Sequence, residues 1–453
     1  DKVVVAEYSD PNPFKVMHAG HLYTTLVGDA IATLFEVAGA TVHRVNYGGD
    51  VGLHVARAMW GIIQELGGEH PEKLNAVPES ERPAWLSTFY ARGTAAYESD
   101  ETAKAEIIAI NKRVYDLHTA NDHESPFAQI YWTCRQWSYD GFDALYSQLG
   151  VHTFERYIPE SEVTPLGLGI VQKGIENGVF EQSDGAIIFK GEDHGLHTRV
   201  FINSNGLPTY EAKDLGLAAL KWRDYHFDKS FIITGNDIVE YMKVVVKALE
   251  HFYPELAGRG VHLTHGMIRL PGGKKMSSRK GNNPKAADIL QAAQEAYARA
   301  HGSSDLQISA GAVKYAFLKH RIGGDMIYDP EESVSLEGNS GPYLQYAHAR
   351  ARSILAKANA EGHTVSDLDQ QERALARKIS EYPEVLQKAL DELMPHHICT
   401  YLYELAQVFN RFYENAKVVG DPRQATRLTL VQLYADILKD GLSLLGITAP
   451  DKM

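Results

Sequence analysis

Two histidines, His18 and His21, flank a glycine in the stretch MHAGH, where an apolar segment gives way to a helical pattern. The free N–H groups and the dipole at the start of a helix favour phosphate, and a glycine lets a ligand approach the backbone. Imidazoles three residues apart lie on one face of the first turn, so both can donate to one phosphate chain. Taken alone, the pattern fits equally well two turn histidines that only satisfy local backbone groups.

A second set of phosphate-binding side chains lies in GGKKMSSRKGNNPK, residues 272–285. Between Gly266 and Ala287 there are six basic residues and no acidic one, in a chain whose net charge is −13. Lysine, arginine and serine can all bind phosphate oxygens. The alternative is a solvated basic loop, but a basic cluster in an acidic protein favours an anionic ligand.

A third stretch, TGND at 234–237, joins a predicted strand to a predicted helix. Ligands of open parallel sheets bind at the carboxyl ends of the strands, where Asp237 can take ribose hydroxyls. By itself, a simple helix N-cap is the better interpretation of this aspartate. The three stretches together have the parts needed to bind ATP, and the absence of a G-x-x-x-x-G-K motif excludes a P-loop enzyme.

The elements that must position these residues follow an α/β pattern. Residues 3–8 predict a buried strand, apolar residues from Leu22 to Phe35 recur at helical spacing, and residues 41–47 predict a second strand. This strand–helix–strand unit implies a parallel sheet with a right-handed crossover. Further strands are predicted at 185–189, 229–234 and 261–270, and a hairpin over 198–210 with its turn near Asn205-Gly206.

Two regions break this alternation. Residues 66–150 are rich in alanine, glutamate and aromatic residues and predict a helical insertion, with a proline-containing break at 71–83. From about residue 310 the periodicity is helical throughout. Apolar stripes over 396–418 and 428–445 predict a separate helical bundle.

The bulk composition limits the classes of protein further. The chain has 453 residues, and no run approaches the roughly 18 uninterrupted apolar residues of a membrane span. Its two cysteines, Cys134 and Cys399, exclude a disulfide framework and a cysteine-rich zinc site and fit a reducing cytoplasm. The net charge argues against non-specific coating of nucleic acid, although it allows a local basic groove.

In this order the stretches resemble a class I aminoacyl-tRNA synthetase, with HAGH as the first signature and KMSSR (275–279) as the second. Their flanks resemble the arginyl-tRNA synthetases closely. The matching segments are EYSDPNPFKVMHAGH at 7–21, GLPTYEAKDLGLA at 206–218, GPYLQYAHARARSI at 341–354 and LKDGLSLLGITAPDKM at 438–453. The resemblance covers essentially the whole chain and is loosest in the insertion.

This resemblance implies a Rossmann-like α/β catalytic domain with a parallel sheet and a helical insertion, followed by an all-α anticodon-binding bundle. We expect the first half of the catalytic domain at 1–65 and the insertion at 66–150. The second half with the KMSSR loop is expected at 151–300, a connecting segment that contacts the tRNA stem at 301–335, and the anticodon-binding domain at 336–453. The insertion is short for a hydrolytic editing domain, so none is predicted.

The resemblance also implies the chemistry of an arginine–tRNA ligase. The carboxylate of L-arginine attacks the α-phosphorus of ATP, which carries Mg²⁺, and arginyl-adenylate and pyrophosphate form. The 2′-hydroxyl at the 3′ end of tRNA(Arg) then takes the arginyl group. No protein nucleophile is needed, because catalysis consists of positioning and charge stabilisation. The family typically requires tRNA for the first step.

Residue roles carry over by position from the family. The implied catalytic residues are Lys15, His18, His21 and Lys275. The implied ATP-binding residues are His18, Gly20, His21, Gly235, Asp237, Lys275, Met276, Ser277 and Ser278. The implied arginine-binding residues are Glu7, Asn12, His21, Glu160, Tyr210, Asp214 and Asp237. No metal site made by the protein itself is predicted.

Three of these residues would recognise the guanidinium: Glu160, Tyr210 and Asp214. Two carboxylates and a phenol suit a planar cation with five N–H donors, and lysine or citrulline would leave the carboxylates poorly paired. Without the family match, a core tyrosine and a helix cap would be the preferred interpretation of Tyr210 and Asp214. Asn12 would hold the amino-acid backbone, and Glu7 would brace Lys15 or the ligand.

The sequence departs from the family pattern at several positions. Ser278 stands in place of the usual second lysine of its loop, and Lys15 occupies the upstream position that compensates for it. Asp10 stands where the family often has serine, which leaves open how the α-ammonium is held. Asn236-Asp237 replaces a usual Arg-Gln pair, and NYGGDVG lacks the tryptophan common after its aspartate.

No counterpart of the family's N-terminal tRNA-binding domain precedes Asp1. The sequence leaves open whether that domain is absent by nature or was removed; absence would weaken tRNA binding. We expect tRNA(Arg) and L-arginine as partners, a monomer, no membrane association and a cytoplasmic location.

Two other functions would also be consistent with part of these features. A catalytically silent paralogue that binds tRNA or a protein would have no reason to keep HAGH, KMSSR, Tyr210 and Asp214. A nucleotidylyltransferase shares the H-x-G-H turn, but the helical tail and the length argue against it. The ligase is therefore the preferred prediction.

Overall fold

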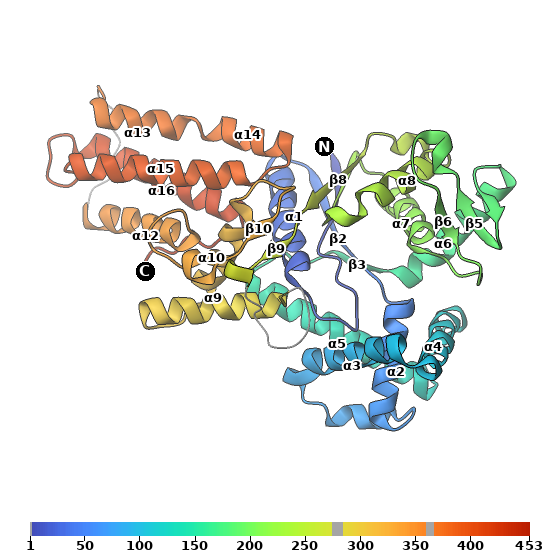
Figure 1. Cartoon of the computed structure of the whole chain (residues 1–453). Helices are drawn as coiled ribbons and strands as arrows, with labels where there is room; N and C mark the ends of the chain where they lie inside the picture. Colours follow the sequence, from blue (N-terminus) through green and yellow to red (C-terminus); the bar gives the residue numbers. More distant parts are fainter. Residues whose placement is uncertain (1, 274–283, 359–366) are drawn as a thin grey trace. The chain divides into compact units, whose positions relative to one another are not determined.

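The computed structural model describes residues 2–273, 284–358 and 367–453 (Figure 1). The chain forms two compact units. Unit 1 consists of Asp1–His21, Thr41–Ser147 and Thr153–Thr264, and unit 2 of Leu22–Ala40, Gln148–His152 and His265–Met453.

The centre of unit 1 is a five-stranded sheet in the order β3-β2-β1-β7-β8. Its strands are β1 (Val3–Glu7), β2 (Thr41–Gly48), β3 (Arg156–Pro159), β7 (Lys229–Gly235) and β8 (Gly260–His265). β1 pairs in parallel with β2 and with β7, and β2 pairs in parallel with β3. The predicted parallel sheet is therefore confirmed, and the apolar run at 3–6 is its buried central strand.

The insertion is helical, as the composition predicts, and Figure 1 shows its helices gathered together. Its helices are α2 (Leu53–Leu66), α3 (Arg82–Ser99), α4 (Glu101–Ala120) and α5 (Pro126–Leu149), with short 3-10 turns at Pro71–Ala76 and Glu79–Glu81 where prolines break the pattern. Met59, Ile107, Val114 and Phe127 belong to one buried cluster that these helices share. The insertion thus has an apolar core of its own.

Helices α6 (Glu160–Glu176) and α7 (Tyr210–Tyr225) cross at two glycines. A Cβ atom on Gly167 would lie 1.9 Å from the carbonyl oxygen of Ala212, and one on Gly216 would lie 2.2 Å from that of Val163. Neither distance is sterically possible, so the two backbones are in direct contact only because both residues are glycine. Helix α6 begins directly after β3, which fixes its first residue at the carboxyl end of the sheet.

Two strand predictions need correction. The second strand of the hairpin predicted over 198–210 is wrong. Within this described segment, its residues form a single isolated β-bridge, between Ile202 and Pro208. The side chain of Asn203 accepts from the N–H groups of Asn205 and Leu207 and closes a tight turn, after which Tyr210 begins a helix. The first arm, β6 (Arg199–Ile202), belongs to an antiparallel sheet with β4 (Glu181–Ser183) and β5 (Ala186–Phe189).

The strand predicted at 261–270 is divided in two. It forms β8 and the short β9 (Ile268–Arg269), which pairs in parallel with β10 (Met326–Ile327). The interruption falls at Gly266, where a Cβ atom would lie 2.4 Å from Asp325 Oδ1 and 2.5 Å from its backbone nitrogen. In unit 1, helix α8 (Val239–Glu250) follows β7 through a single 3-10 turn at Asn236–Ile238, as the pattern predicts.

Unit 2 is mainly helical. Its helices are the main part of α1 (Ala19–Val37), α9 (Ala286–His301), α10 (Leu306–Leu318), α11 (Pro330–Ser333), α12 (Gly341–Ala358), α13 (Gln370–Ser380), α14 (Tyr382–Glu392), α15 (His396–Asn415) and α16 (Gln424–Leu444). Both predicted apolar stripes are buried, including Leu402 and Phe409 on α15 and Tyr434 and Leu438 on α16. The predicted helical bundle is confirmed.

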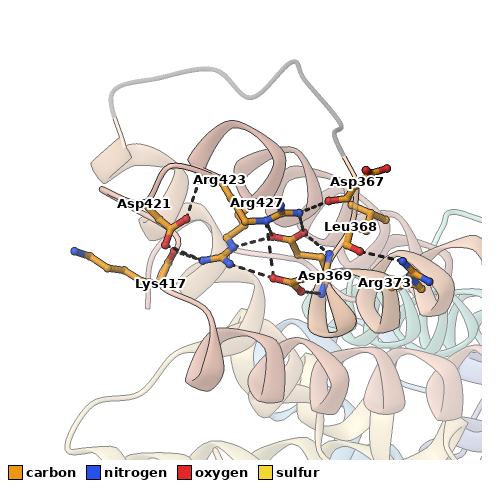
Figure 2. Close-up of polar contacts among 9 residues, drawn as sticks. Asp367, Leu368, Asp369, Arg373, Lys417, Asp421, Arg423 and Arg427 are labelled. Atoms are coloured by element: carbon orange, nitrogen blue, oxygen red, sulfur yellow. Dashed lines mark hydrogen bonds and ion pairs between the residues drawn. The ribbon is translucent and has the colours of Figure 1, made fainter.

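A cluster of hydrogen bonds and ion pairs joins α13 to the beginning of α16 (Figure 2). The carboxylate of Glu372 is fully buried and receives N–H groups from both Arg423 and Arg427, with Arg427 Nε at 2.9 Å. Bonds from these arginines and from the Asp369 backbone hold the pKa of Glu372 down, at about 2. Asp369 and Glu372 also form a capping box, so one interaction set both starts α13 and joins it to α16.

In the described parts of the chain, the search for long apolar helices finds none that could cross a membrane.

The crossing of α6 and α7 yields a testable prediction. Gly167→Ala forces a methyl group against the Ala212 carbonyl, and we expect the free energy of unfolding to fall by about 2 kcal/mol. Gly169→Ala is the matched control, since this glycine lies on the same helix with no heavy atom near its missing Cβ. It should be neutral or stabilising by roughly 0.5–1 kcal/mol. Urea unfolding followed by circular dichroism measures both; equal effects would contradict the close-packing argument.

Candidate active site

The two signature histidines lie at the first turn of α1, with their rings stacked 3.8 Å apart. His18 Nδ1 accepts from the N–H of Gly20 at 3.1 Å, and His21 Nδ1 accepts from the N–H of His18 at 3.2 Å. An accepting Nδ1 carries no hydrogen, so a neutral ring must carry its hydrogen on Nε2. Both rings therefore satisfy local backbone groups.

Lys15 lies in the loop before these histidines, and its Nζ is 4.6 Å from the centre of the Tyr90 ring. Burial raises the pKa of the Tyr90 phenol, but the charge of Lys15 and a hydrogen bond to it lower the pKa more, so the net shift is downward. Tyr90 belongs to α3 of the insertion. The insertion therefore holds the lysine that the sequence assigns to catalysis.

The loop after β2 packs closely against the side chains of Asn12 and Glu160. The N–H of Gly49 donates to Asn12 Oδ1 at 2.7 Å, and a Cβ atom at Gly49 would lie 2.7 Å from that oxygen and 3.0 Å from Glu160 Oε1. His54 Nε2 is 2.7 Å from the Gly49 carbonyl, and burial and nearby lysines lower the pKa of His54 to about 3. His54 is therefore neutral, donates to this carbonyl, and fixes the loop that orients Asn12.

Glu160 is the first residue of α6 and is paired with a lysine inside the protein. Lys213 Nζ lies 2.6 Å from Glu160 Oε2, and the two side chains are only 4% and 5% exposed. Burial raises the pKa of Glu160, and Lys213 opposes the rise without cancelling it. Tyr115 of α4 is also bonded to Lys213, so the insertion contributes to this pair.

Asp50 fixes the start of α6. Its carboxylate accepts from the N–H of Ser161 at 2.9 Å and from the Ser161 hydroxyl at 2.7 Å. Arg135 of the insertion lies 3.1 Å from the same carboxylate. Because Ser161 follows Glu160, this contact sets where the Glu160 side chain begins.

Glu7 is fully buried at the end of β1 and is bound by Lys221 of α7. The cation that the structure places at Glu7 is thus Lys221 and not Lys15, and the expected contact of Glu7 with the ligand remains a prediction. Lys213, Leu217 and Lys221 follow one another at four-residue spacing, so both lysines lie on one face of α7. The second oxygen of Glu7, Oε1, is buried and has no hydrogen-bond partner in the described residues.

Asp214 lies in the second turn of α7, where the hydroxyl of Tyr241 from α8 donates to its Oδ2. Burial raises its pKa to about 7; the charges of Glu7 and Glu160 add to this shift, and Tyr241 and Lys221 oppose it. Asp214 is therefore not a helix cap but a carboxyl group that is about half protonated near neutral pH.

Tyr210 opens α7 and is 58% exposed, so it is not a core tyrosine. The Nζ atom of Lys213 lies 5.2 Å from the centre of its ring. The exposed phenol thus lies beside the Glu160–Lys213 pair, which is where the resemblance places it.

We call Glu7, Asp10, Glu160 and Asp214 the acidic cluster. Electrostatic coupling links these carboxylates: Glu7 raises the pKa of Asp10 and Asp214, and Glu160 raises that of Asp214. The cluster gathers side chains from β1, the following loop, α6 and α7. Such carboxylates favour a cationic ligand.

For the other predicted site residues, the structure gives fewer contacts or none. Gly235 ends β7, and Asp237 follows it with an exposed side chain whose Oδ1 would lie 2.5 Å from a Cβ on Gly235. Gly20 lies between the two histidines and is partly exposed. Lys275, Met276, Ser277 and Ser278 lie outside the described residues.

Sequence reasoning missed the partners of the predicted residues. These are Tyr90 at Lys15, Tyr115 and Lys213 at Glu160, Lys221 at Glu7, and Tyr241 at Asp214. One signal was present: Lys213 and Lys221 are basic residues on the face of α7 next to a predicted ligand residue. The tyrosines of α3 and α4 gave no signal, because aromatic residues at helical spacing usually belong to a core.

Comparison with known proteins agrees with this geometry. Residues 1–329 match the family "tRNA synthetases class I (R), catalytic domain", and residues 344–453 match the DALR anticodon binding domain. The arginine–tRNA ligase of Flavobacterium psychrophilum is 31% identical over all of this chain and 80% of its own length. That of Porphyromonas gingivalis strain W83 is 30% identical over all of this chain and 81% of its own length.

The chain belongs to the arginyl-tRNA synthetase family. The structure of Thermus thermophilus arginyl-tRNA synthetase has the same fold, with a TM-score of 0.80 and 24% identity over all of this chain and 83% of that one. The predictions of fold class and of an arginine–tRNA ligase are thereby confirmed, and nothing supports the silent paralogue. The roles of individual site residues and the domain boundaries remain predictions.

The buried pair of this arginyl-tRNA synthetase gives a second prediction. Lys213→Met leaves Glu160 buried without its cation, and we expect the free energy of unfolding to fall by about 3 kcal/mol. Glu160→Gln alone leaves Lys213 unpaired and should cost a similar amount. The double variant removes both charges, so its loss should be much smaller than the sum. Urea unfolding of the four proteins measures this cycle; additive losses would show that the pair is not coupled.

Proposed function

We propose that the acidic cluster is the arginine site of this ligase and that the turn at His18 and His21 is its ATP site. The observation that supports this most directly is the raised pKa of Asp214, about 7, in a partly exposed carboxyl group. A carboxyl held in this state gains most from a ligand that brings a positive charge. Glu160 and Tyr210 both lie close to Lys213, the residue before Asp214.

The guanidinium of arginine would lie against Asp214, with Tyr210 covering one side and Glu160 accepting a further N–H. Asp214 Oδ2 is held by Tyr241, which leaves its other oxygen for the ligand. A neutral urea group, as in citrulline, would bring no charge to offset the carboxylates, and lysine would bring fewer donors. Specificity would therefore come from unpaired acceptors that only a guanidinium satisfies.

Activation of arginine would proceed by positioning. Asn12, oriented by the N–H of Gly49, would hold the α-carboxylate or the α-amino end near the ATP α-phosphorus. The turn that carries His18 and His21 would bind the phosphate oxygens, and Lys15 would add a positive charge. As charge develops on the phosphate and moves to pyrophosphate, these donors stabilise it without a covalent enzyme intermediate.

Mg²⁺ would enter with ATP, bound by phosphate oxygens and water. Among the described residues, no group of three or more His, Cys, Asp or Glu side chains that could hold a metal ion is found. The metal would neutralise charge on the triphosphate. Lys275, Ser277 and Ser278 would close over pyrophosphate.

The 2′-hydroxyl of the terminal tRNA(Arg) adenosine would then take the arginyl group, with the DALR domain binding the anticodon end of that tRNA. The chain would act as a monomer in the cytoplasm, where translation takes place and where two unpaired, buried cysteines are stable.

The proposal is tested by charging total tRNA with labelled arginine and ATP. We expect arginyl-tRNA from the wild-type protein and at least a hundredfold loss with Asp214→Ala, because the guanidinium then lacks its charged partner. ATP binding should be retained. Charging of a different amino acid, or undiminished charging by Asp214→Ala, would refute the site assignment.

The pH dependence of arginine binding gives a third prediction. Arginine binds the ionised form of Asp214, whose pKa in the free protein is raised to about 7. Affinity should therefore rise with pH up to about 7 and level off above it, because below this pH binding must first remove a proton. Calorimetric titration between pH 5.5 and 8 measures this. Asp214→Asn should bind weakly at every pH, and an unchanged profile in that variant would exclude Asp214 as the titrating group.

A further inference from the structure

The chain beside Lys15 is anchored in the core of the helical insertion. Phe14 is fully buried in the apolar cluster of that core, and its ring centre lies 5.5 Å from that of Tyr131 on α5. The N–H of Phe14 donates to Ser138 Oγ, also on α5, at 2.9 Å. The φ angle of Phe14 is 65°, in the left-handed region that a bulky residue rarely adopts. Such a conformation persists where the surrounding structure holds it, so α5 fixes the backbone from which the Lys15 side chain starts.

The other end of the Lys15 side chain is also held by the insertion. Its Nζ atom lies 4.6 Å from the centre of the Tyr90 ring, which is the geometry of a cation–π contact. Burial raises the pKa of the Tyr90 phenol, and the charge of Lys15 is the largest of the effects that bring this pKa below its ordinary value. Among residues 2–273, 284–358 and 367–453, no carboxylate lies within ion-pair distance of Lys15. In this part of the chain, the ring is therefore the contact that orients the ammonium group.

Backbone contacts fix the place of Tyr90, which lies between two points at which α3 touches α2. A Cβ atom on Gly61 would lie 2.4 Å from the carbonyl oxygen of Phe89, and one on Gly93 would lie 1.9 Å from that of Arg57. Both distances are too short for any side chain, so the two helices are in backbone contact one residue before Tyr90 and three residues after it. The position of the ring relative to α2 thus does not depend on flexible side chains.

An ammonium group that is already ordered has an advantage in binding phosphate. A lysine side chain loses much conformational freedom when it binds, and a ligand that meets a group already in place does not have to order it. The same argument applies to a transition state, whose developing charge must be met in a fixed position. Lys15 is half-buried, with its backbone fixed at Phe14 and its ammonium group at Tyr90, so few of its rotamers remain accessible.

We propose that Tyr90 is a positioning residue for the reaction: it acts through Lys15, whose ammonium group it holds in the place where a phosphate oxygen of ATP binds. This inference rests on the proposed function, because it takes Lys15 as a ligand of the ATP phosphates. It adds to that function a role for α3 of the insertion, which would contribute to nucleotide affinity although no predicted ATP-binding residue lies on it.

The test compares two substitutions of Tyr90. Tyr90→Leu removes the ring, whereas Tyr90→Phe keeps the ring face at Lys15 and removes only the hydroxyl. ATP affinity is measured by calorimetry, and kcat and the KM values for ATP and arginine are measured in tRNA charging. We expect Tyr90→Leu to weaken ATP binding about tenfold and to leave the KM for arginine unchanged, and Tyr90→Phe to retain at least about a third of the affinity. Unchanged ATP binding by Tyr90→Leu would refute the proposal.

A double-mutant cycle with Lys15 shows whether Tyr90 acts through this residue. Lys15→Met removes the ammonium group and should itself weaken ATP binding. In the Lys15→Met protein, Tyr90→Leu should then have no further effect on ATP affinity, because the group that Tyr90 positions is gone. An equal loss in both backgrounds would show that Tyr90 affects ATP by another route, and the positioning role would be wrong.

The matched control is Tyr97→Leu. Tyr97 lies two turns further along α3, is partly buried like Tyr90, and has the Cζ atom of Arg57 4.4 Å from its ring centre. Both leucine variants therefore lose a tyrosine and a cation–π contact of the insertion, and their thermal unfolding temperatures should fall by similar amounts. Tyr97→Leu should leave ATP affinity unchanged. If it weakens ATP binding as much as Tyr90→Leu does, the effect reflects loosening of the insertion and the proposal fails.

The outcomes also separate this proposal from the proposed function. If Lys15→Met leaves ATP binding unchanged, the role of Lys15 in the proposed function is wrong, and the role of Tyr90 fails with it. If Lys15→Met weakens ATP binding and Tyr90→Leu does not, the role of Tyr90 alone is refuted and the ATP site stands. The calorimetric cycle gives this answer even for a protein that charges no tRNA, so it does not depend on the outcome of the charging assay.

Discussion

The contact between α6 and α7 is the constraint on which the proposed arginine site depends. At Gly167 and Gly216 the backbones of the two helices touch, and no side chain larger than hydrogen fits between them. One helix starts with Glu160, and the other carries Lys213, Asp214 and Lys221. Their distance of approach therefore sets how closely Glu160 and Lys213 are brought together, and with it the electrostatic interaction between them.

Charges placed this close must be compensated from within the protein. Burial raises the pKa of Glu160, and the charge of Lys213 opposes that rise. The two lysines of α7 are each paired with a glutamate, Lys213 with Glu160 and Lys221 with Glu7. The two glutamates are therefore paired with cations of the protein itself.

Much of the fold could be predicted from the sequence, because the spacing of apolar residues indicates both the strands of the parallel sheet and the helices of the bundle. The segment 198–210 was misjudged because Asn203 closes a turn through its side chain, which apolar alternation does not reveal. For the site, the sequence predicted roles for the histidine turn, Glu160 and Asp214, and these remain predictions. The motifs could not locate Lys221 at Glu7 or Tyr90 at Lys15, because such pairs join residues 214 and 75 positions apart and depend on how helices pack.

The helical insertion contributes side chains that contact the predicted site residues and their neighbours. Tyr90 of α3 lies against Lys15, Tyr115 of α4 is bonded to Lys213, and Arg135 of α5 lies against Asp50, which fixes the start of α6. Three insertion helices thus each contact one charged residue outside the insertion, two of them in loops and one on α7. The face of a tyrosine ring can bind an ammonium group, and Tyr90 contacts Lys15 in this way. In the proposed mechanism, therefore, a neighbouring helix and not only its own loop would fix the position of Lys15.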